Sequence, residues 1–156
     1  MTTTEGKIYI TALKSLERLE IQFLPKEIQF GRKIDYGEVI IVGRNNPLYH
    51  FSGGSNEFTI ELDFLAYTEN REDVIQRCKW LEALTSNDGF SKPPEKVKVT
   101  FGKLFKPTEV FIITNFTYKL SGFKSQYGYL PTQAIATVTF SLDPEENRKH
   151  SDIKWN

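Results

Sequence analysis

Few residues of this chain could do nucleophilic or metal chemistry. It has a single cysteine, Cys78, and two histidines, His50 and His150. A thiol nucleophile needs a base that takes its proton, and no spacing motif connects Cys78 with either histidine. The same three residues are too few for a four-ligand zinc site. Cys78 also falls on the apolar stripe of a predicted helix, where a free cysteine usually packs as a small hydrophobic residue. We therefore expect no catalytic thiol and no metal site.

Two carboxylates have a spacing that would suit acid–base chemistry. Glu61 and Asp63 alternate on one predicted strand, so their side chains point to the same face about 7 Å apart. Carboxylates on the polar face of a strand are more often solvated or paired with a lysine across the sheet, and Lys98 is a candidate partner. Nothing in this pair requires an enzyme, and we expect no catalytic residues.

The stretch SGGSNEFTIELDF (52–64) raises the possibility of a phosphate-binding loop. Such loops lie between a strand and the N-terminus of a helix, whereas Gly53 and Gly54 precede a strand that is predicted to begin at Glu57. Glycine also reaches backbone angles that other residues avoid. We interpret Gly53 and Gly54 as a hinge that turns the chain into this strand, and we expect no nucleotide or other cofactor.

The composition limits the remaining functions. A length of 156 residues suits one domain, and 20 basic and 20 acidic residues give no net charge to attract nucleic acid or an anionic membrane. Apolar runs such as VIIV (39–42) are far shorter than the roughly 20 residues that span a bilayer. The N-terminus lacks the pattern of a secretory signal, and the single cysteine suggests a reducing compartment. We expect neither specific nucleic-acid binding nor a membrane segment.

Most of the chain alternates apolar and polar residues with the period of a β-strand. Six segments show this pattern: 7–13, 19–23, 57–67, 97–101, 110–120 and 134–142. The order of strands, one helix and more strands favours a mainly β fold with one packed helix, an antiparallel barrel or sandwich that spans residues 1–142. Residues 143–156 are charged and lose the alternation, so we expect a surface tail there.

The helix is predicted where the period changes. Over residues 71–84 the apolar side chains recur at helical spacing and form one stripe, which consists of Val74, Ile75, Cys78, Leu81 and Leu84. This stripe should pack against the sheet.

Residues 31–56 conflict with the rest of the pattern. Five glycines and the turn-forming NNP (45–47) predict a long, irregular, hairpin-like excursion, yet it carries the apolar run VIIV. Either VIIV is a short buried strand, or it covers a partner. The second interpretation predicts a segment that is mobile alone and ordered on assembly. Its candidate subunit-interface residues are Val39, Ile40, Ile41, Val42, Leu48 and Tyr49.

The order of these motifs resembles the tube-type domain of contractile injection systems and myophage tails. The resemblance covers about residues 18–142 and depends on order and spacing. It includes a strand ending in proline, a glycine pair before an alternating strand, a helix soon after, and PP before a strand ending in Phe-Gly. The corresponding stretches are IQFLPKEI (21–28), SGGSNEFTIELDF (52–64), REDVIQRCKWLEAL (71–84), KPPEKVKVTFG (92–102), VFIITNFTYKL (110–120) and AIATVTFSL (134–142).

The resemblance implies a small tail-tube-like β-barrel that works as a structural subunit of a phage tail or injection device. Such a subunit forms a homo-oligomeric, usually hexameric ring that initiates the inner tube or joins it to the baseplate hub. Its partners would be the tail tube protein and hub or spike proteins, in a virion or injection particle assembled in the bacterial cytoplasm. Hub proteins of this family often carry a LysM domain, which does not follow the matching region here, so cell-wall binding is not implied.

A rival from another class stays open, namely a small-molecule-binding β-barrel. Its interior would be lined by aromatic residues such as Phe111, Phe116 and Tyr118. A binding barrel should be a monomer that takes up one apolar dye molecule, whereas a tube-type subunit should enter rings or tubes.

Overall fold

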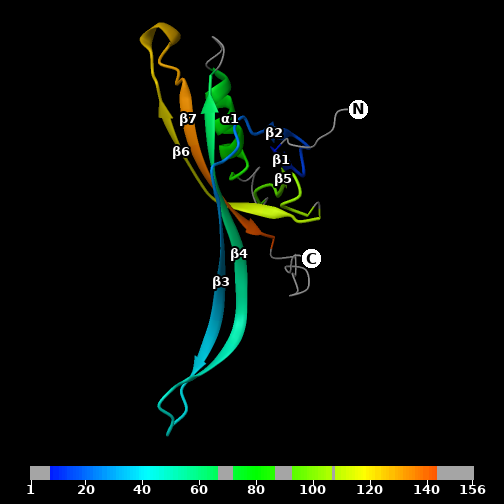
Figure 1. Ribbon diagram of the computed structural model, residues 1–156, viewed down its shortest axis with the longest axis vertical. Coiled ribbons are helices and arrows are strands. Elements are labelled where there is room, and N and C mark those ends of the chain that lie inside the picture. The colour runs from blue at the N-terminus through cyan, green and yellow to red at the C-terminus, as the bar shows by residue number, and fades with distance from the viewer. Residues whose placement is uncertain (1–7, 67–71, 87–92, 107, 144–156) are drawn as a thin grey trace.

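The computed structural model describes residues 8–66, 72–86, 93–106 and 108–143 (Figure 1). The elements are β1 (Ile8–Ala12), β2 (Arg18–Glu20), β3 (Ile28–Val39), β4 (Leu48–Leu65), α1 (Glu72–Ala83), β5 (Val97–Phe101), β6 (Phe111–Ser121), the short 3₁₀ helix η1 (Ser125–Tyr127) and β7 (Gln133–Leu142). The prediction of a mainly β fold with one helix is confirmed.

All seven strands form one antiparallel sheet in the order β2-β1-β5-β6-β7-β4-β3. The predicted closure into a barrel is wrong for the single chain, because β2 and β3 end the sheet and do not pair with each other. The joint between β5 and β6 is narrow, since only Val97 and Phe111 are paired there. The sheet can therefore fold over at this joint.

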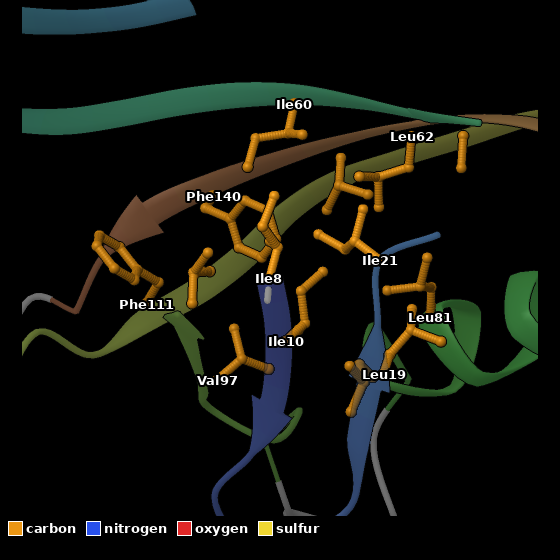
Figure 2. Close-up of a cluster of buried hydrophobic side chains, with 14 of the residues drawn as sticks. Ile8, Ile10, Leu19, Ile21, Ile60, Leu62, Leu81, Val97, Phe111 and Phe140 are labelled. Carbon is orange, nitrogen blue, oxygen red and sulfur yellow. The ribbon is translucent and has the colours of Figure 1, made fainter. Parts of the chain in front are cut away.

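Folding over at the β5–β6 joint produces two layers with one core between them. Ile10 and Val97, from the layer of β1 and β5, lie in the same buried cluster as Ile60 and Phe140 from β4 and β7 (Figure 2). Helix α1 packs on β7, β4 and β6. The core therefore covers one face of β6, of β7 and of the part of β4 that pairs with β7, residues 57–65. We call this side of the sheet the core face.

The predicted helix is confirmed, with bounds Glu72–Ala83. Val74, Cys78 and Leu81 are buried in the core, as the apolar stripe predicted. The indole Nε1 of Trp80 donates a hydrogen bond to a Glu17 carboxylate oxygen at 2.7 Å, which ties the helix to the β1–β2 turn. Arg77 and Asp73 form an ion pair of 3.5 Å one turn apart.

Residues 31–56 form a paired hairpin, so the hairpin-like part of the prediction is confirmed, whereas the irregularity is limited to one bulge opposite Asp35 and Tyr36. Strand β3 pairs with β4 from Ile28↔Ile60 out to Val39↔Leu48. Strand β4 begins at Leu48 and not at Glu57, so Gly53 and Gly54 lie inside it. Figure 1 shows this hairpin extending away from the two-layered body of the molecule.

The start of the predicted tail belongs to the body. Asp143 is buried, and its carboxylate pairs with the Nζ of Lys96 at 2.7 Å. Its backbone N–H donates to the carbonyl of Val110 at 3.0 Å. Residues 144–156 lie outside the described part of the chain.

Candidate interaction surface

The hairpin has an inner part that belongs to the body and an outer part that extends beyond it. Strand β7 pairs with β4 only from Glu57 to Leu65. Residues 48–56 of β4 therefore pair with β3 alone. We call residues 31–56 the outer hairpin: a two-stranded ribbon with the turn 40–47 at its tip. A two-stranded ribbon in water is marginally stable by itself.

A β-bulge in the outer hairpin decides which side chains share a face. Asp35 pairs with Gly53 and Tyr36 pairs with Phe51, which leaves Ser52 as an extra residue on β4. The hydroxyl of Ser52 donates to the carbonyl oxygen of Asp35 at 2.8 Å. Because side chains alternate along a strand, absorbing Ser52 in the bulge brings Phe51 and Tyr49 to the face that carries Phe58 and Ile60.

Glycine is required in this bulge for a backbone reason. Gly53 has a φ of 142°, which residues with a side chain rarely adopt. A Cβ atom on Gly54 would lie 2.8 Å from the carbonyl oxygen of Lys33. The two glycines therefore shape a bulge inside a continuous strand, and do not form a hinge that precedes one.

One face of the hairpin carries an apolar stripe that continues outward from the core. Register and the bulge place its members on the core face: Phe30, Ile34, Tyr36, Tyr49 and Phe51. All five are exposed, and the Tyr36 and Phe51 rings contact edge to face at 6.1 Å. Sequence reasoning identified only Tyr49. The alternation of apolar residues from Ile28 to Tyr36 could have revealed the β3 half of the stripe. The β4 half could not be found in the same way, because the bulge shifts the alternation there.

The tip of the hairpin is also apolar and exposed. Ile40 is 84% and Val42 100% exposed, and Val39, Ile41, Leu48 and Tyr49 are exposed as well. The backbone N–H of Arg44 donates to the carbonyl of Ile41 at 3.2 Å and closes the turn. The structure therefore brings all six predicted interface residues together at one end of the molecule, with none of them in the core. Of the two interpretations of VIIV, the buried strand is excluded for this chain alone.

The outer hairpin also presents unpaired strand edges. Strand β3 ends the sheet order and is 12 residues long, whereas β2 at the other end has three. A second open edge lies in the body, where Phe111 is the one residue of β6 that pairs with β5. An unpaired edge is a row of N–H and C=O groups that can bind another strand.

The sheet face opposite the core is polar. On β4 it carries Glu57, Thr59, Glu61 and Asp63, and the Thr59 hydroxyl lies 3.1 Å from that of Thr139 on β7. Helix α1 packs on the other face, where Leu62 and Phe64 are buried. This face therefore presents hydroxyl and carboxylate groups, together with Ile135 of β7 and Lys119 opposite it on β6.

A pocket of about 370 Å³ lies where the hairpin leaves the body. Its aromatic wall comes from Phe30, Phe58, Phe105 and Phe111, and the ring centroids of Phe58 and Phe105 are 4.8 Å apart. Leu104, Arg32, Asn56, Glu57, Glu109 and Gly31 complete the lining. We call this the basal pocket. Sequence reasoning missed it, because its walls come from three distant segments.

The groups considered for chemistry do not form a catalytic arrangement in the described residues. Cys78 is fully buried in the core, and burial is the main cause that raises the pKa of its thiol to about 11, with a further increase from nearby Glu82. His50 lies on the outer hairpin opposite Gly37. A Cys78–His50 pair is therefore not formed, and His150 lies outside the described residues.

Glu61 and Asp63 lie on the polar face of β4, as predicted, opposite Thr137 and Ile135 of β7. The suggested partner Lys98 is on β5, opposite Thr11 of β1. A cross-strand pair between Lys98 and these carboxylates is therefore wrong, because β4 and β5 are not neighbours in the sheet.

The described residues contain neither a metal-binding cluster nor a membrane-spanning helix. No three His, Cys, Asp or Glu residues gather there as they would around a metal ion. None of the helical segments described is long and apolar enough to cross a bilayer. No protein-family model matches the chain, and the comparison with curated proteins finds no match.

Proposed function

We propose that this chain is a structural subunit of a contractile phage tail or related injection device. Copies form a homo-oligomeric ring, hexameric as the resemblance implies, that initiates the inner tube or joins it to the baseplate hub. The neighbours are the tail tube protein and hub or spike proteins. The particle is assembled in the bacterial cytoplasm, and the role requires no catalysis or cofactor.

The exposed outer hairpin is the observation that carries the proposal. It combines the apolar stripe with the six tip residues Val39–Val42, Leu48 and Tyr49. Contiguous apolar surface of this kind is rare on a monomer and usually marks a contact with a partner. A two-stranded ribbon also gains stability when a neighbour packs on its apolar face. Assembly would supply that neighbour.

The unpaired edge of β3 supports a ring in particular. A strand of 12 residues with an open edge is a hazard in a monomer, because it can pair with unrelated strands. In a closed ring the same edge of each copy is covered by its neighbour, so no edge stays free. Barrel closure, which a single chain does not achieve, would then occur between subunits.

The polar sheet face suits the wall of a water-filled channel. Thr59, Thr137 and Thr139 are half-buried among their neighbours, and Glu61 adds negative charge. These hydroxyl and carboxylate groups, and the exposed Lys119 of β6 on the same face, stay hydrated along such a wall. A ring that turns this face inward would keep its apolar hairpins available for protein contacts.

The test is assembly of the purified chain. Alone at high concentration, or co-expressed with candidate tube and hub proteins, it should form rings with a central channel, visible by electron microscopy and measurable by sedimentation. A chain that stays monomeric under all these conditions and binds neither protein would overturn the proposal. Genes for tube, sheath and spike proteins beside its own gene would add independent support.

The basal pocket favours a second candidate, binding of a small apolar molecule. Its volume lies near the lower end of the roughly 300–1,000 Å³ of ligand pockets. The predicted barrel interior is absent from the described chain, however. The rings of Phe116 and Tyr118, with centroids 5.4 Å apart, pack against each other and against the core. Stoichiometric binding of an apolar dye by a monomer, reduced by Phe105→Ala, would favour this candidate over the ring.

A further inference from the structure

We propose that the basal pocket binds the segment of its own chain that follows β7, residues 144–156, with Trp155 against the aromatic wall. Bound there, the segment controls access to the pocket, because any other apolar ligand has to displace it. The proposal concerns a single copy of the chain and does not depend on the ring.

The basal pocket has a fixed inner wall and an open outer wall. Phe105 contacts three other rings, with centroid distances of 4.8 Å to Phe58, 5.6 Å to Phe111 and 6.0 Å to Phe30. Phe58 and Phe111 are buried in the core, whereas Phe30 and Leu104 at the outer wall are 57% and 42% exposed. Apolar surface that lines a concave site in this way is usually covered by a ligand or a partner.

Strand β7 ends at the edge of this pocket. Its last residue, Leu142, pairs with Phe111, which lines the pocket. The next residue, Asp143, is held in place: its backbone N–H donates to the carbonyl of Val110 at 3.0 Å, and its carboxylate pairs with Lys96 at 2.7 Å. The segment that follows Asp143 therefore starts from a fixed point beside the pocket.

Pro144 directs the chain out of the sheet at this point. Proline has no backbone N–H, so β7 cannot extend its hydrogen-bond ladder along the outer part of β4. Trp155 follows Asp143 by 12 residues, which span up to about 40 Å when fully extended. This length is ample for the segment to turn back and bring Trp155 into a pocket that begins next to Phe111.

The segment carries an apolar pair that suits the pocket. Ile153 and Trp155 flank Lys154, so in an extended stretch the two apolar side chains point to one side and Lys154 points to the other. A volume of about 370 Å³ has room for an indole ring. Register places Arg32 on the core face, beside the aromatic wall. A guanidinium binds the face of an indole better than that of other rings, which favours Trp155 as the anchor.

Tethering favours this segment over other occupants. A segment joined to its site by a short flexible linker has an effective concentration on the order of millimolar. A second copy or a free small molecule must instead arrive by diffusion and lose its translational and rotational freedom on binding. The chain's own segment is therefore the occupant with the smallest entropic cost.

Tryptophan fluorescence tests whether the indole is bound. Trp80 and Trp155 are the two tryptophans of the chain, so Trp80→Phe leaves Trp155 as the reporter. Its emission should lie at the short wavelengths of a buried indole and should resist quenching by acrylamide. Adding Phe105→Ala should shift the emission toward that of an indole in water. Emission typical of water before Phe105→Ala is added, in protein that circular dichroism shows to be folded, would overturn the proposal.

Competition with an apolar fluorescent dye such as anilinonaphthalene sulfonate tests the control of access. Trp155→Ala should bind the dye about tenfold more tightly than the unsubstituted chain, as expected if the segment fills about nine-tenths of the pockets. Lys154→Ala is the matched control and should leave the dye affinity unchanged, because that side chain points away from the pocket. Equal dye affinities of the two variants would contradict docking by Trp155.

A disulfide trap identifies the copy that supplies the segment. Trp155→Cys combined with Leu104→Cys should form a disulfide within one chain, at a rate independent of protein concentration. The control partner is Asn115→Cys, which is exposed on the opposite face of β6 and within reach of an undocked segment. Native Cys78 should stay unreacted, because it is buried with a raised pKa.

The outcomes of the trap are distinct. A fast disulfide with Leu104→Cys and a slow one with Asn115→Cys would support the docking. Equal rates with both partners would overturn it, because a segment that is not bound reaches both positions. A disulfide that forms only between chains would show that a second copy fills the pocket, and would overturn the contact within one chain.

Discussion

Strand β4 has two halves that both carry large apolar side chains on one face and differ completely in their surroundings. In the inner half, Phe58, Ile60, Leu62 and Phe64 are buried beneath α1 and the β1–β5 layer. In the outer half, apolar residues such as Tyr49 and Phe51 share that same face but are exposed. The difference is the second layer, which covers one half and not the other. The inner half therefore stabilises the fold, whereas the outer half is available for contacts.

The largest expected effect compares two phenylalanines of this strand. Phe64 is 0% and Phe51 60% exposed. Phe64→Ala should lower the free energy of unfolding by about 3–5 kcal/mol, through lost burial and the cavity left behind. Phe51→Ala should cost less than about 1 kcal/mol, because water already reaches that side chain. Urea unfolding of both variants measures the difference, and equal costs would mean that the outer hairpin is part of the core.

High pH should weaken the body through Cys78. The pKa of its buried thiol is raised from 9.0 to about 11, so below pH 9 the thiol is neutral in both the folded and unfolded states. Between pH 9 and 11 the unfolded chain loses the proton first, and stability falls by up to about 3 kcal/mol. Urea unfolding at pH 8 and pH 10.5 checks this, with Cys78→Ala as the control that removes this part of the pH dependence. An identical pH dependence in that variant would contradict the assignment.

The bulge should be breakable with little loss of stability. Gly53→Val places a branched side chain at a φ of 142°, which should cost about 1–3 kcal/mol or force β4 into regular pairing. Regular pairing would turn Tyr49 and Phe51 to the opposite face, and assembly should be lost.

Deleting Ser52 in the Gly53→Val variant is the control, because it removes the extra residue that the bulge absorbs. Without its extra residue the strand needs no bulge, and Phe51 can again lie opposite Tyr36. Assembly should then return, as measured by sedimentation. If the double variant stays monomeric, the position of the aromatic rings is not what assembly requires.

The smallest effect on stability is expected at the tip. Ile40→Asp combined with Ile41→Asp should change the free energy of unfolding by less than about 0.5 kcal/mol, because both side chains are exposed. The same variant should fail to assemble. Loss of folding in this variant would show that the tip packs within its own chain.

Proteolysis gives an independent measure of the tip. Arg44 lies in the turn, whereas Arg32 and Lys33 lie within paired strand. Trypsin should therefore cut the free protein first at Arg44, and assembly should slow that cut. Equal rates in free and assembled protein would contradict a partner at the tip.

Much of the body could be predicted from local pattern. Alternation correctly identified the inward faces of β1 and of inner β4, and the change of period identified α1 with its buried Val74, Cys78 and Leu81. The outer hairpin was harder, because its glycines suggested irregular chain. Their actual role, shaping a bulge, depends on the partner strand, which the local sequence does not reveal.

In the helix and in the strands without a bulge, the sequence by itself determined which side chains share a face, because the periods of strand and helix are local properties of the backbone. It also determined that Val39–Val42 is an apolar run that is either buried or covered by a partner, and the structure shows it exposed. Only the tertiary structure decided that β4 extends beyond its second layer, that the sheet stays open, and that distant phenylalanines meet in the basal pocket. These features depend on which segments pack together across the chain, and alternation is the same whether or not another layer covers the face.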